Sequence, residues 1–185
     1  MSLALGAEAS FVARTIDFDR RHLTDVLRAA AAHRGSALVE IYQNCPIYND
    51  GAFDAIKGKD TRDYAVIPLV HGEPVRFGTD GEMAVVRDAA SGALSVSSAA
   101  DVDSAAVVVH DAHAADPSLA FALSRLTDAG HLDRAPIGIF RSVDRPAYDD
   151  LVRTQLDTAR QAAGDGDLVQ LLLGADTWTV GGTRS

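Results

Sequence analysis

Hydrophobic positions in the first part of the chain change from a strand-like pattern to a helix-like pattern and back. Residues 9–16 are small, apolar and partly β-branched, which predicts a short strand. Asp17-Phe18-Asp19 then offers an N-cap for a helix that ends near Gly35. Residues 37–42 follow as a second strand rich in β-branched and aromatic side chains. The apolar face expected for the helix consists of Leu23, Val26, Leu27 and Ala30. A short helix between two strands predicts a parallel βαβ unit.

Beyond residue 50 the chain changes to short apolar runs separated by turn residues. An antiparallel meander is expected from four such runs, at residues 66–70, 75–77, 83–87 and 93–96. Two further strands are expected at residues 106–110 and 136–141. Helices are expected from Pro117 to Gly130, after Pro146, and over residues 168–173, with a disordered tail at residues 181–185. The fold class expected from this order is α/β.

Composition and charge exclude several classes of protein. The 185 residues carry a formal net charge of −9, and an acidic surface repels nucleic-acid phosphates. There is no run of about 20 apolar residues, so no membrane span is expected. Residues 1–8 lack the positive region of a signal peptide. A single cysteine allows no internal disulfide. We therefore expect a cytoplasmic protein that binds neither nucleic acid nor membranes.

The single cysteine, Cys45, lies just after the second predicted strand. Open α/β sheets bind their ligands beyond the carboxyl ends of the strands, so Cys45 lies where chemistry is expected. Thiolates are the usual ligands of iron–sulfur clusters, and a cubane needs four of them. The alternative is a small buried thiol near a strand end, with no role in binding. By itself, one cysteine does not decide between these interpretations.

Two segments resemble the β subunits of 2-oxoacid:ferredoxin oxidoreductases, most closely the 2-oxoglutarate type. The first runs from Gly6 to Arg14 (GAEASFVAR), and the second runs from Gly35 to Gly51 (GSALVEIYQNCPIYNDG). The resemblance is specific over about the first 50 residues and looser beyond, and it covers only the C-terminal half of such a subunit. It implies that residues 1–50 complete a thiamine-diphosphate-binding domain. Residues 51–185 would then form a small α+β C-terminal region.

The resemblance also implies a function for the complete subunit. That function is the thiamine-diphosphate-dependent oxidative decarboxylation of a 2-oxoacid with coenzyme A, as in 2-oxoglutarate synthase. The implied cofactors are thiamine diphosphate, Mg²⁺ and one [4Fe–4S] cluster, and the implied partners are an α subunit and ferredoxin. Cys45 matches the fourth cysteine ligand of the cluster. Asn44 and Asn49 are weaker candidates for supporting hydrogen bonds. No catalytic residue is carried over to this chain.

Motifs of the complete subunit are missing from this chain. In the complete subunit, the metal–diphosphate motif is Gly-Asp-Gly followed at a distance by Asn, and the N-terminal half carries Cys-x-x-Cys. Gly164-Asp165-Gly166-Asp167 looks similar, but no Asn follows it and it lies between two predicted helices. We therefore expect a fragment that binds no cofactor by itself, is inactive by itself, and self-associates through apolar sheet edges.

Other candidate sites carry weaker signals. His110-Asp111-Ala112-His113 could hold a metal, but no third ligand lies beside it in sequence, so turn residues are the favoured interpretation. The remaining histidines are expected on the surface, and Trp178 is expected to anchor the C-terminus. No Gly-x-Ser-x-Gly elbow of a serine hydrolase is present. A different hypothesis is a non-catalytic interaction or regulatory domain derived from the same fold.

Overall fold

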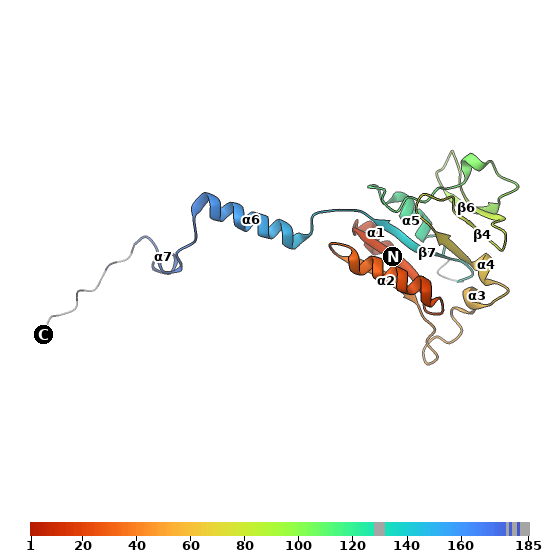
Figure 1. The fold of residues 1–185 in the computed structure, drawn as a ribbon, viewed down its shortest axis with the longest axis horizontal. Helices are drawn as coiled ribbons and strands as arrows, with labels where there is room; N and C mark the ends of the chain where they lie inside the picture. The colour runs from red at the N-terminus through yellow and green to blue at the C-terminus, as the bar shows by residue number, and fades with distance from the viewer. Residues whose placement is uncertain (128–131, 177, 179–180, 182–185) are drawn as a thin grey trace. The chain divides into compact units, whose positions relative to one another are not determined.

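The computed structural model describes residues 1–127, 132–176, 178 and 181. The chain divides into two units, Met1–Arg145 and Pro146–Ser185 (Figure 1). The helices of the first unit are α1 (Ser2–Gly6), α2 (Arg20–Ala32), α3 (Asp54–Lys57), α4 (Arg62–Ala65) and α5 (Ser118–Ser124), with a 3-10 turn at Ser104–Ala106. Its strands are β1 (Phe11–Ile16), β2 (Ala37–Tyr42), β3 (Val66–Leu69), β4 (Arg76–Phe77), β5 (Met83–Arg87), β6 (Leu94–Ser98) and β7 (Ala135–Ser142). The second unit contains α6 (Tyr148–Ala163) and α7 (Leu168–Leu173).

The main sheet has the strand order β2-β1-β7-β3. β1 and β2 pair in parallel over their full lengths, from Phe11 opposite Ala37 to Ile16 opposite Tyr42. Together with α2 they form the expected βαβ unit, and the α/β class is confirmed. β7 pairs antiparallel with β1, so this sheet joins strands from residues 1–50 to strands from later in the chain. The assignment of residues 1–50 to a thiamine-diphosphate domain stays a prediction.

Helix α2 begins as the sequence predicts, but its buried face differs. Asp19 is the N-cap, and its carboxylate accepts a hydrogen bond from the backbone N–H of His22 at 3.0 Å. The helix ends at Ala32, slightly before the predicted end at Gly35. Val26 is buried against β1, whereas Leu27 is 44% exposed, so the prediction for Leu27 was wrong. Ala30 packs against this cluster as predicted, and Ala29 packs there as well.

β3 does not belong to the antiparallel meander, which corrects the prediction for residues 66–70. It pairs in parallel with β7, from Val66 opposite Ala135 to Leu69 opposite Gly138. β3 is an edge strand of the sheet. An edge strand tolerates the proline within β3, although proline has no backbone N–H to donate to a neighbouring strand. Gly138 has a φ of +129°, and a Cβ there would lie 2.6 Å from the carbonyl oxygen of Leu69. Only glycine fits this close approach between the two strands.

The remaining strands form a second sheet with the order β4-β5-β6, which is antiparallel as predicted. The strand expected at residues 106–110 is not formed. Val107 and Val109 make only isolated bridges, to Val86 and Pro74, and Val109 is 53% exposed. The main core lies between the two sheets and the helices α1 and α5, and its largest members are Leu5, Ile67, Phe77, Leu123 and Phe140. A smaller cluster under α2 covers the other face of the main sheet.

Helix α5 begins one residue later than predicted, because Pro117 is its N-cap and not its first helical residue. The predicted end at Gly130 lies outside the described residues.

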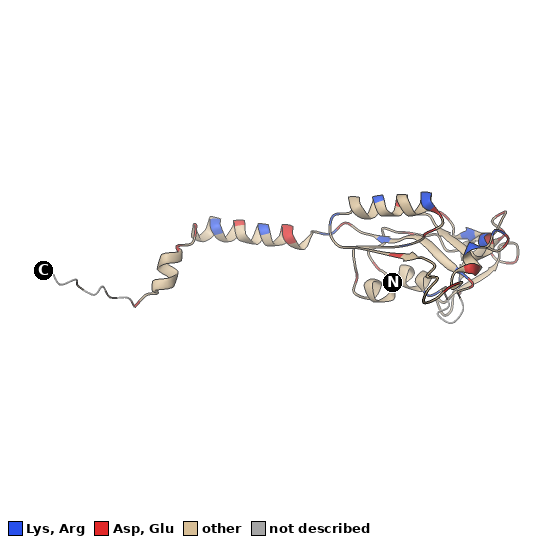
Figure 2. Cartoon of the chain, turned by 90° about the horizontal axis from the view of Figure 1, so that it is seen from below, with Lys and Arg blue, Asp and Glu red and all other residues tan. Residues whose placement is uncertain are grey.

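The second unit contains the two predicted C-terminal helices. α6 carries charges of both signs and α7 carries none (Figure 2). The loop between them contains Gly164-Asp165-Gly166, and the Asp165 side chain is 94% exposed, so this segment is a solvated connection as expected. Trp178 is 83% exposed, so the prediction that it anchors the C-terminus was wrong. Residues 182–185 of the predicted disordered tail lie outside the described residues.

Candidate functional site

Cys45 lies beyond the carboxyl end of β2, as the sequence predicts. The parallel register places the carboxyl ends of β1 and β2 at the same edge of the sheet, with Ile16 opposite Tyr42. Cys45 begins a tight turn that returns to Asn49, whose backbone N–H donates to the Cys45 carbonyl at 2.9 Å. The cysteine is partly exposed and forms no disulfide. Its thiol is therefore accessible at the sheet edge where α/β proteins bind ligands.

The Asn44 side chain closes the loop that carries Cys45. Its amide donates to the Asp50 carboxylate at 2.9 Å, and its carbonyl oxygen accepts from the backbone N–H of Gly51 at 3.0 Å. These two hydrogen bonds hold the residues before Cys45 close to the residues after the turn. Asn44 thus shapes the loop through Asp50 and Gly51, and its described bonds do not involve the cysteine sulfur.

The backbone around Cys45 favours its thiolate form. The backbone N–H groups of Tyr48, Ile47 and Asn49 hydrogen-bond the sulfur and lower the pKa of the thiol. The effect of Tyr48 is the largest, that of Ile47 comes next, and that of Asn49 is the smallest. The negative charge of Asp50 works against this shift. Hydrogen bonds from N–H groups stabilise the charged form of a sulfur ligand and tune the potential of iron–sulfur clusters. The turn is therefore suited to present a thiolate to a metal.

Large apolar side chains close to Cys45 in sequence are exposed on the surface. Ile47 is 83% exposed and Tyr48 is 89% exposed, and Ile41 at the end of β2 is 42% exposed. A cluster of exposed apolar side chains is typical of a surface that another polypeptide covers.

The base of the Cys45 loop is anchored to the sheet by aromatic and charged contacts. The rings of Tyr42 and Phe53 stack with their centroids 5.0 Å apart, which joins the start of the loop to its end. On β1, the Arg14 guanidinium lies over the Tyr42 ring at 4.9 Å and binds Glu40 of β2 at 2.6 Å. The loop therefore starts from a fixed strand end.

The residues present fit one of the implied cofactors better than the others. A thiolate held by backbone N–H groups is a suitable iron–sulfur ligand, but the chain has one cysteine and a cubane needs four ligands. Within the ranges that the structure describes, no group of three or more His, Cys, Asp or Glu side chains could hold a metal ion. Gly164-Asp165-Gly166 follows a helix and not a strand, so it does not fit the diphosphate and Mg²⁺ of thiamine diphosphate.

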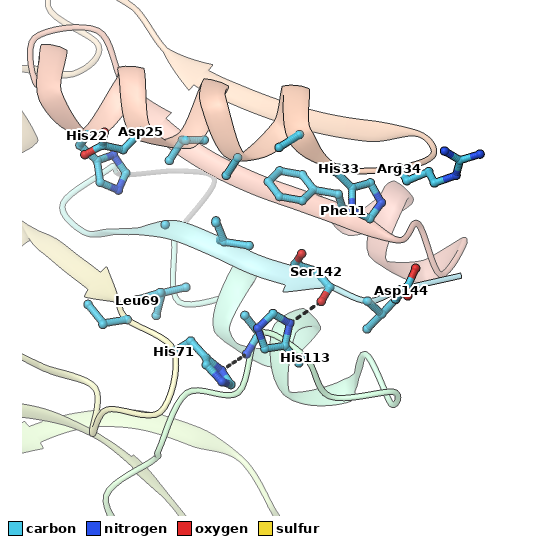
Figure 3. A pocket seen from close by; sticks show the side chains of 18 residues that line it. Phe11, His22, Asp25, His33, Arg34, Leu69, His71, His113, Ser142 and Asp144 are labelled. Atoms are coloured by element: carbon cyan, nitrogen blue, oxygen red, sulfur yellow. Dashed lines mark hydrogen bonds between the residues drawn. The ribbon is translucent and has the colours of Figure 1, made fainter. Parts of the chain in front are cut away.

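The histidines gather more than the sequence predicts. His110 is 1% exposed, and its Nε2 hydrogen-bonds the Ile139 carbonyl at 2.8 Å. His113 instead lies beside His71, with ring centroids 4.3 Å apart (Figure 3). Together with His22 and His33, this pair lines a pocket between α2 and the strands β3 and β7. The prediction that the remaining histidines are scattered was therefore wrong for His22, His33 and His71, although His71 is exposed as predicted. His131 lies outside the described residues.

One signal in the sequence could have located His71. It comes two residues after Leu69, the last residue of β3, and thus lies at the carboxyl end of a strand. The parallel pairing of β3 with β7, which brings it beside His113, joins segments far apart in sequence and leaves no local pattern.

None of the helices in the described residues has the length and apolar character that a membrane crossing requires.

Comparison with known proteins identifies relatives of the chain. It is 54% identical to the 2-oxoglutarate oxidoreductase subunit KorB of Mycobacterium tuberculosis over 182 residues, which is 97% of this chain and 48% of KorB. It is 35% identical over 75 residues to a 2-oxoacid:ferredoxin oxidoreductase subunit beta of a Sulfolobus species, which covers 40% of this chain and 24% of that subunit. The chain thus spans about half the length of the mycobacterial relative. No family model matches it.

A solved structure shares the fold. It is the 2-oxoglutarate:ferredoxin oxidoreductase from Magnetococcus marinus with 2-oxoglutarate, coenzyme A and succinyl-CoA bound. The similarity covers 92% of this chain and 41% of that chain, with a TM-score of 0.50 and 18% sequence identity. The resemblance to β subunits of 2-oxoacid:ferredoxin oxidoreductases that the sequence predicts is confirmed.

Proposed function

From its relationship to the β subunits of 2-oxoacid:ferredoxin oxidoreductases, we propose that this chain is the C-terminal half of such a subunit, of the 2-oxoglutarate type. The complete assembly would decarboxylate a 2-oxoacid oxidatively with coenzyme A and pass the electrons to ferredoxin. The main support is the 54% identity to KorB over 97% of the chain. The proposed location is the cytoplasm, where free thiols such as Cys45 stay reduced.

Cys45 is the residue of this chain with a proposed cofactor role. Its thiolate would be one of four ligands of a [4Fe–4S] cluster, and the other three cysteines would come from outside these 185 residues, which contain a single cysteine. When bound, the cluster would accept and release electrons one at a time. The N–H groups of Tyr48 and Ile47 would stabilise the negative charge on the Cys45 sulfur in both redox states.

Thiamine diphosphate and Mg²⁺ belong to the proposed assembly but not to this chain. The segment that looks most like their motif does not fit them, so the part of the β subunit outside these residues would bind both. A β subunit of this type also requires an α subunit, and the exposed side chains of Ile47 and Tyr48 offer a surface for one of these partners.

Complementation of activity tests this proposal. The chain is mixed with the N-terminal half of mycobacterial KorB and the matching α subunit, and 2-oxoglutarate- and coenzyme A-dependent reduction of a dye is measured. We expect activity with all components and none when this chain is left out. If the three polypeptides assemble but no activity depends on this chain, the proposal is wrong.

The second candidate function is that of a non-catalytic interaction domain. It is favoured by the failure of Gly164-Asp165-Gly166 to fit a diphosphate site. In that case the chain binds its partner equally well when Cys45 is replaced by serine, and no cluster forms in the complex.

A further inference from the structure

A pocket that contains four histidines has no part in the proposed function. It has a volume of about 730 Å³ and lies between α2 and the strands β3 and β7 (Figure 3). This volume is within the range of pockets that bind small organic molecules. All of its lining residues precede Arg145, so the pocket belongs wholly to the first unit of the chain.

The middle of the pocket is apolar. Its walls are Phe11, Val26, Leu69, Val70 and Ile139. Ala29 adds little side-chain volume and Gly138 adds none, which leaves a groove open beside α2. The groove follows α2 from His22 to His33, a distance of roughly 16 Å at about 1.5 Å per residue. Such a groove suits a linear hydrocarbon chain.

Two histidines lie side by side at one end of the pocket. His71 follows the last residue of β3 by two positions, and His113 comes from the loop that precedes α5. Their ring centroids are 4.3 Å apart, close enough for one small polar group to contact both rings (Figure 3). Because β7 is antiparallel to β1, this end of the sheet is opposite to the end that carries Cys45. The pocket and the Cys45 turn are therefore separate sites.

Backbone groups fix which nitrogen of each neutral ring carries the proton. The Ser142 carbonyl oxygen can only accept, and it lies 2.6 Å from the His113 Nδ1, so that nitrogen holds the proton and the Nε2 is an acceptor. The His71 Nδ1 accepts from the backbone N–H of Ala112 at 3.2 Å, so its Nε2 holds the proton and is a donor. Neither Nε2 has a hydrogen-bonding partner within the part of the chain that the structure describes. The pair thus presents one donor and one acceptor.

The charges at this end of the pocket disfavour an anion. Asp144 lines the pocket after β7, and the Asp111 carboxylate lies 3.4 Å from the His71 Nδ1. Arg34 supplies the one guanidinium among the described lining residues, and it already has an interaction of its own. A carboxylate would therefore meet two like charges and would leave the acceptor of His113 without a donor. An ammonium group would leave the donor of His71 without an acceptor.

We propose that this pocket binds an uncharged molecule that has a linear apolar chain and a terminal hydroxyl group, as a medium-chain alcohol has. The hydroxyl donates to the His113 Nε2 and accepts from the His71 Nε2, so each nitrogen gains the partner that it lacks. The apolar chain lies along α2 and adds affinity by covering Val26, Leu69 and Ile139. Both hydrogen bonds form with uncharged imidazoles, so binding requires no proton uptake.

A titration of the full chain with 1-octanol tests the proposal, with heptyl methyl ether as an isomer that has no O–H donor. Binding is followed by nuclear magnetic resonance of the chain with ¹⁵N-labelled histidine at pH 8.5, well above the ordinary histidine pKa of about 6.5. We expect octanol to bind with one-to-one stoichiometry and about fivefold or more tighter than the ether. Octanoate should bind more weakly than octanol. Equal affinities for octanol and the ether, tighter binding of octanoate, or no binding of octanol would overturn the proposal.

The same spectra show where each ring holds its proton. Couplings between ring protons and nitrogens should show Nδ1–H for His113 and Nε2–H for His71 before any ligand is added. Octanol should then shift the Nε2 resonance of His113, and the ether should leave it in place. A proton on the His113 Nε2, or an Nε2 resonance that octanol does not move, would contradict the proposed hydrogen bond.

Three variants separate the hydroxyl contact from a general loss of structure. His113→Leu should lower the affinity for octanol to that for the ether, while the ether still binds. Ala32 is exposed and lines the pocket, so Ala32→Trp should weaken the binding of both probes. Ala31→Trp is the matched control, because Ala31 is exposed on the same helix outside the pocket lining. If Ala32→Trp and Ala31→Trp affect octanol binding equally, the pocket is not the site.

Cys45→Ser distinguishes this proposal from the proposed function. The substitution lies at the other end of the sheet, so the variant should bind octanol as the unchanged chain does. Octanol binding that is lost with Cys45→Ser would show that the two sites are not separate.

Discussion

Arg14 and Glu40 face each other across the β1–β2 pair, with 2.6 Å between Nε and the carboxylate oxygen. Arg14 is 3% exposed, and it also donates to the Thr127 hydroxyl at 2.9 Å. The guanidinium is thus held inside the sheet mainly by a carboxylate from the strand that leads to Cys45. This ion pair connects the stability of the sheet to the position of the proposed cluster ligand.

Glu40→Gln is expected to lower the free energy of unfolding by about 1–2 kcal/mol, because Arg14 then stays buried without a negative partner. The loss is smaller than for a fully buried pair, since the Glu40 side chain is 34% exposed. Urea unfolding followed by circular dichroism measures it. Glu73→Gln, on an exposed turn, is the matched control and should change stability by less than about 0.5 kcal/mol. Equal effects of both variants would show that the pair contributes nothing.

Alkylation of Cys45 by iodoacetamide should have a midpoint at lower pH than alkylation of the same cysteine in a short unstructured peptide of residues 43–51. The N–H groups of Tyr48 and Ile47 lower the pKa of the thiol in the folded turn, and the thiolate is the reactive form. The rate is measured as a function of pH for both molecules. Identical midpoints would mean that the turn does not stabilise the thiolate.

Stability should fall as the pH drops below about 6.5, the ordinary pKa of histidine. Burial lowers the pKa of His22 and His110 in the folded chain, so the unfolded chain takes up their protons at a higher pH. The loss continues until the lowered pKa values are reached. The exposed carboxylate of Glu82 also has a lowered pKa, but its effect begins only below about pH 4.5.

Urea unfolding at a series of pH values measures this dependence. His22→Gln should make the decline between neutral pH and pH 5 shallower, since one of the two imidazoles with a lowered pKa no longer titrates. A stability that is constant over this range would contradict the account.

The chain should self-associate in the absence of a partner, because β2 lies at the edge of the main sheet with Leu38 and Ile41 about 40% exposed. Sedimentation velocity at increasing concentration should show a growing dimer or larger species. Leu38→Lys should shift the chain toward monomer, whereas Val109→Lys, at an exposed site away from this edge, should not. A monomer at all concentrations would show that the β2 edge is not adhesive.

The sequence predicted the local parts of this fold better than its long-range pairings. The βαβ unit and the N-cap at Asp19 follow from periodicity and capping within about 30 residues. β3 was assigned to the wrong sheet because its apolar run suits either an antiparallel edge or a parallel pair with β7, a strand far along the chain. A strand was predicted at residues 106–110 because three successive valines are typical of a strand, although only isolated bridges form there.

For the candidate site too, the sequence predicted local features better than contacts between distant residues. Cys45 could be placed at a strand end from its local sequence, and the structure adds the N–H groups that stabilise its thiolate. The pairing of His71 with His113 could not be predicted, because it depends on the pairing of β3 with β7, to whose Ser142 carbonyl oxygen His113 is hydrogen-bonded.

The most direct test of the proposed function is the formation of the cluster itself. The chain is incubated with the N-terminal half of mycobacterial KorB, ferrous iron and sulfide without oxygen, and the visible absorbance and paramagnetic resonance of a [4Fe–4S] cluster are recorded. The account predicts a cluster when both halves are present, and none when this chain carries Cys45→Ser although the two halves still bind each other. A cluster that forms equally well with Cys45→Ser would contradict the assignment of Cys45 as a ligand.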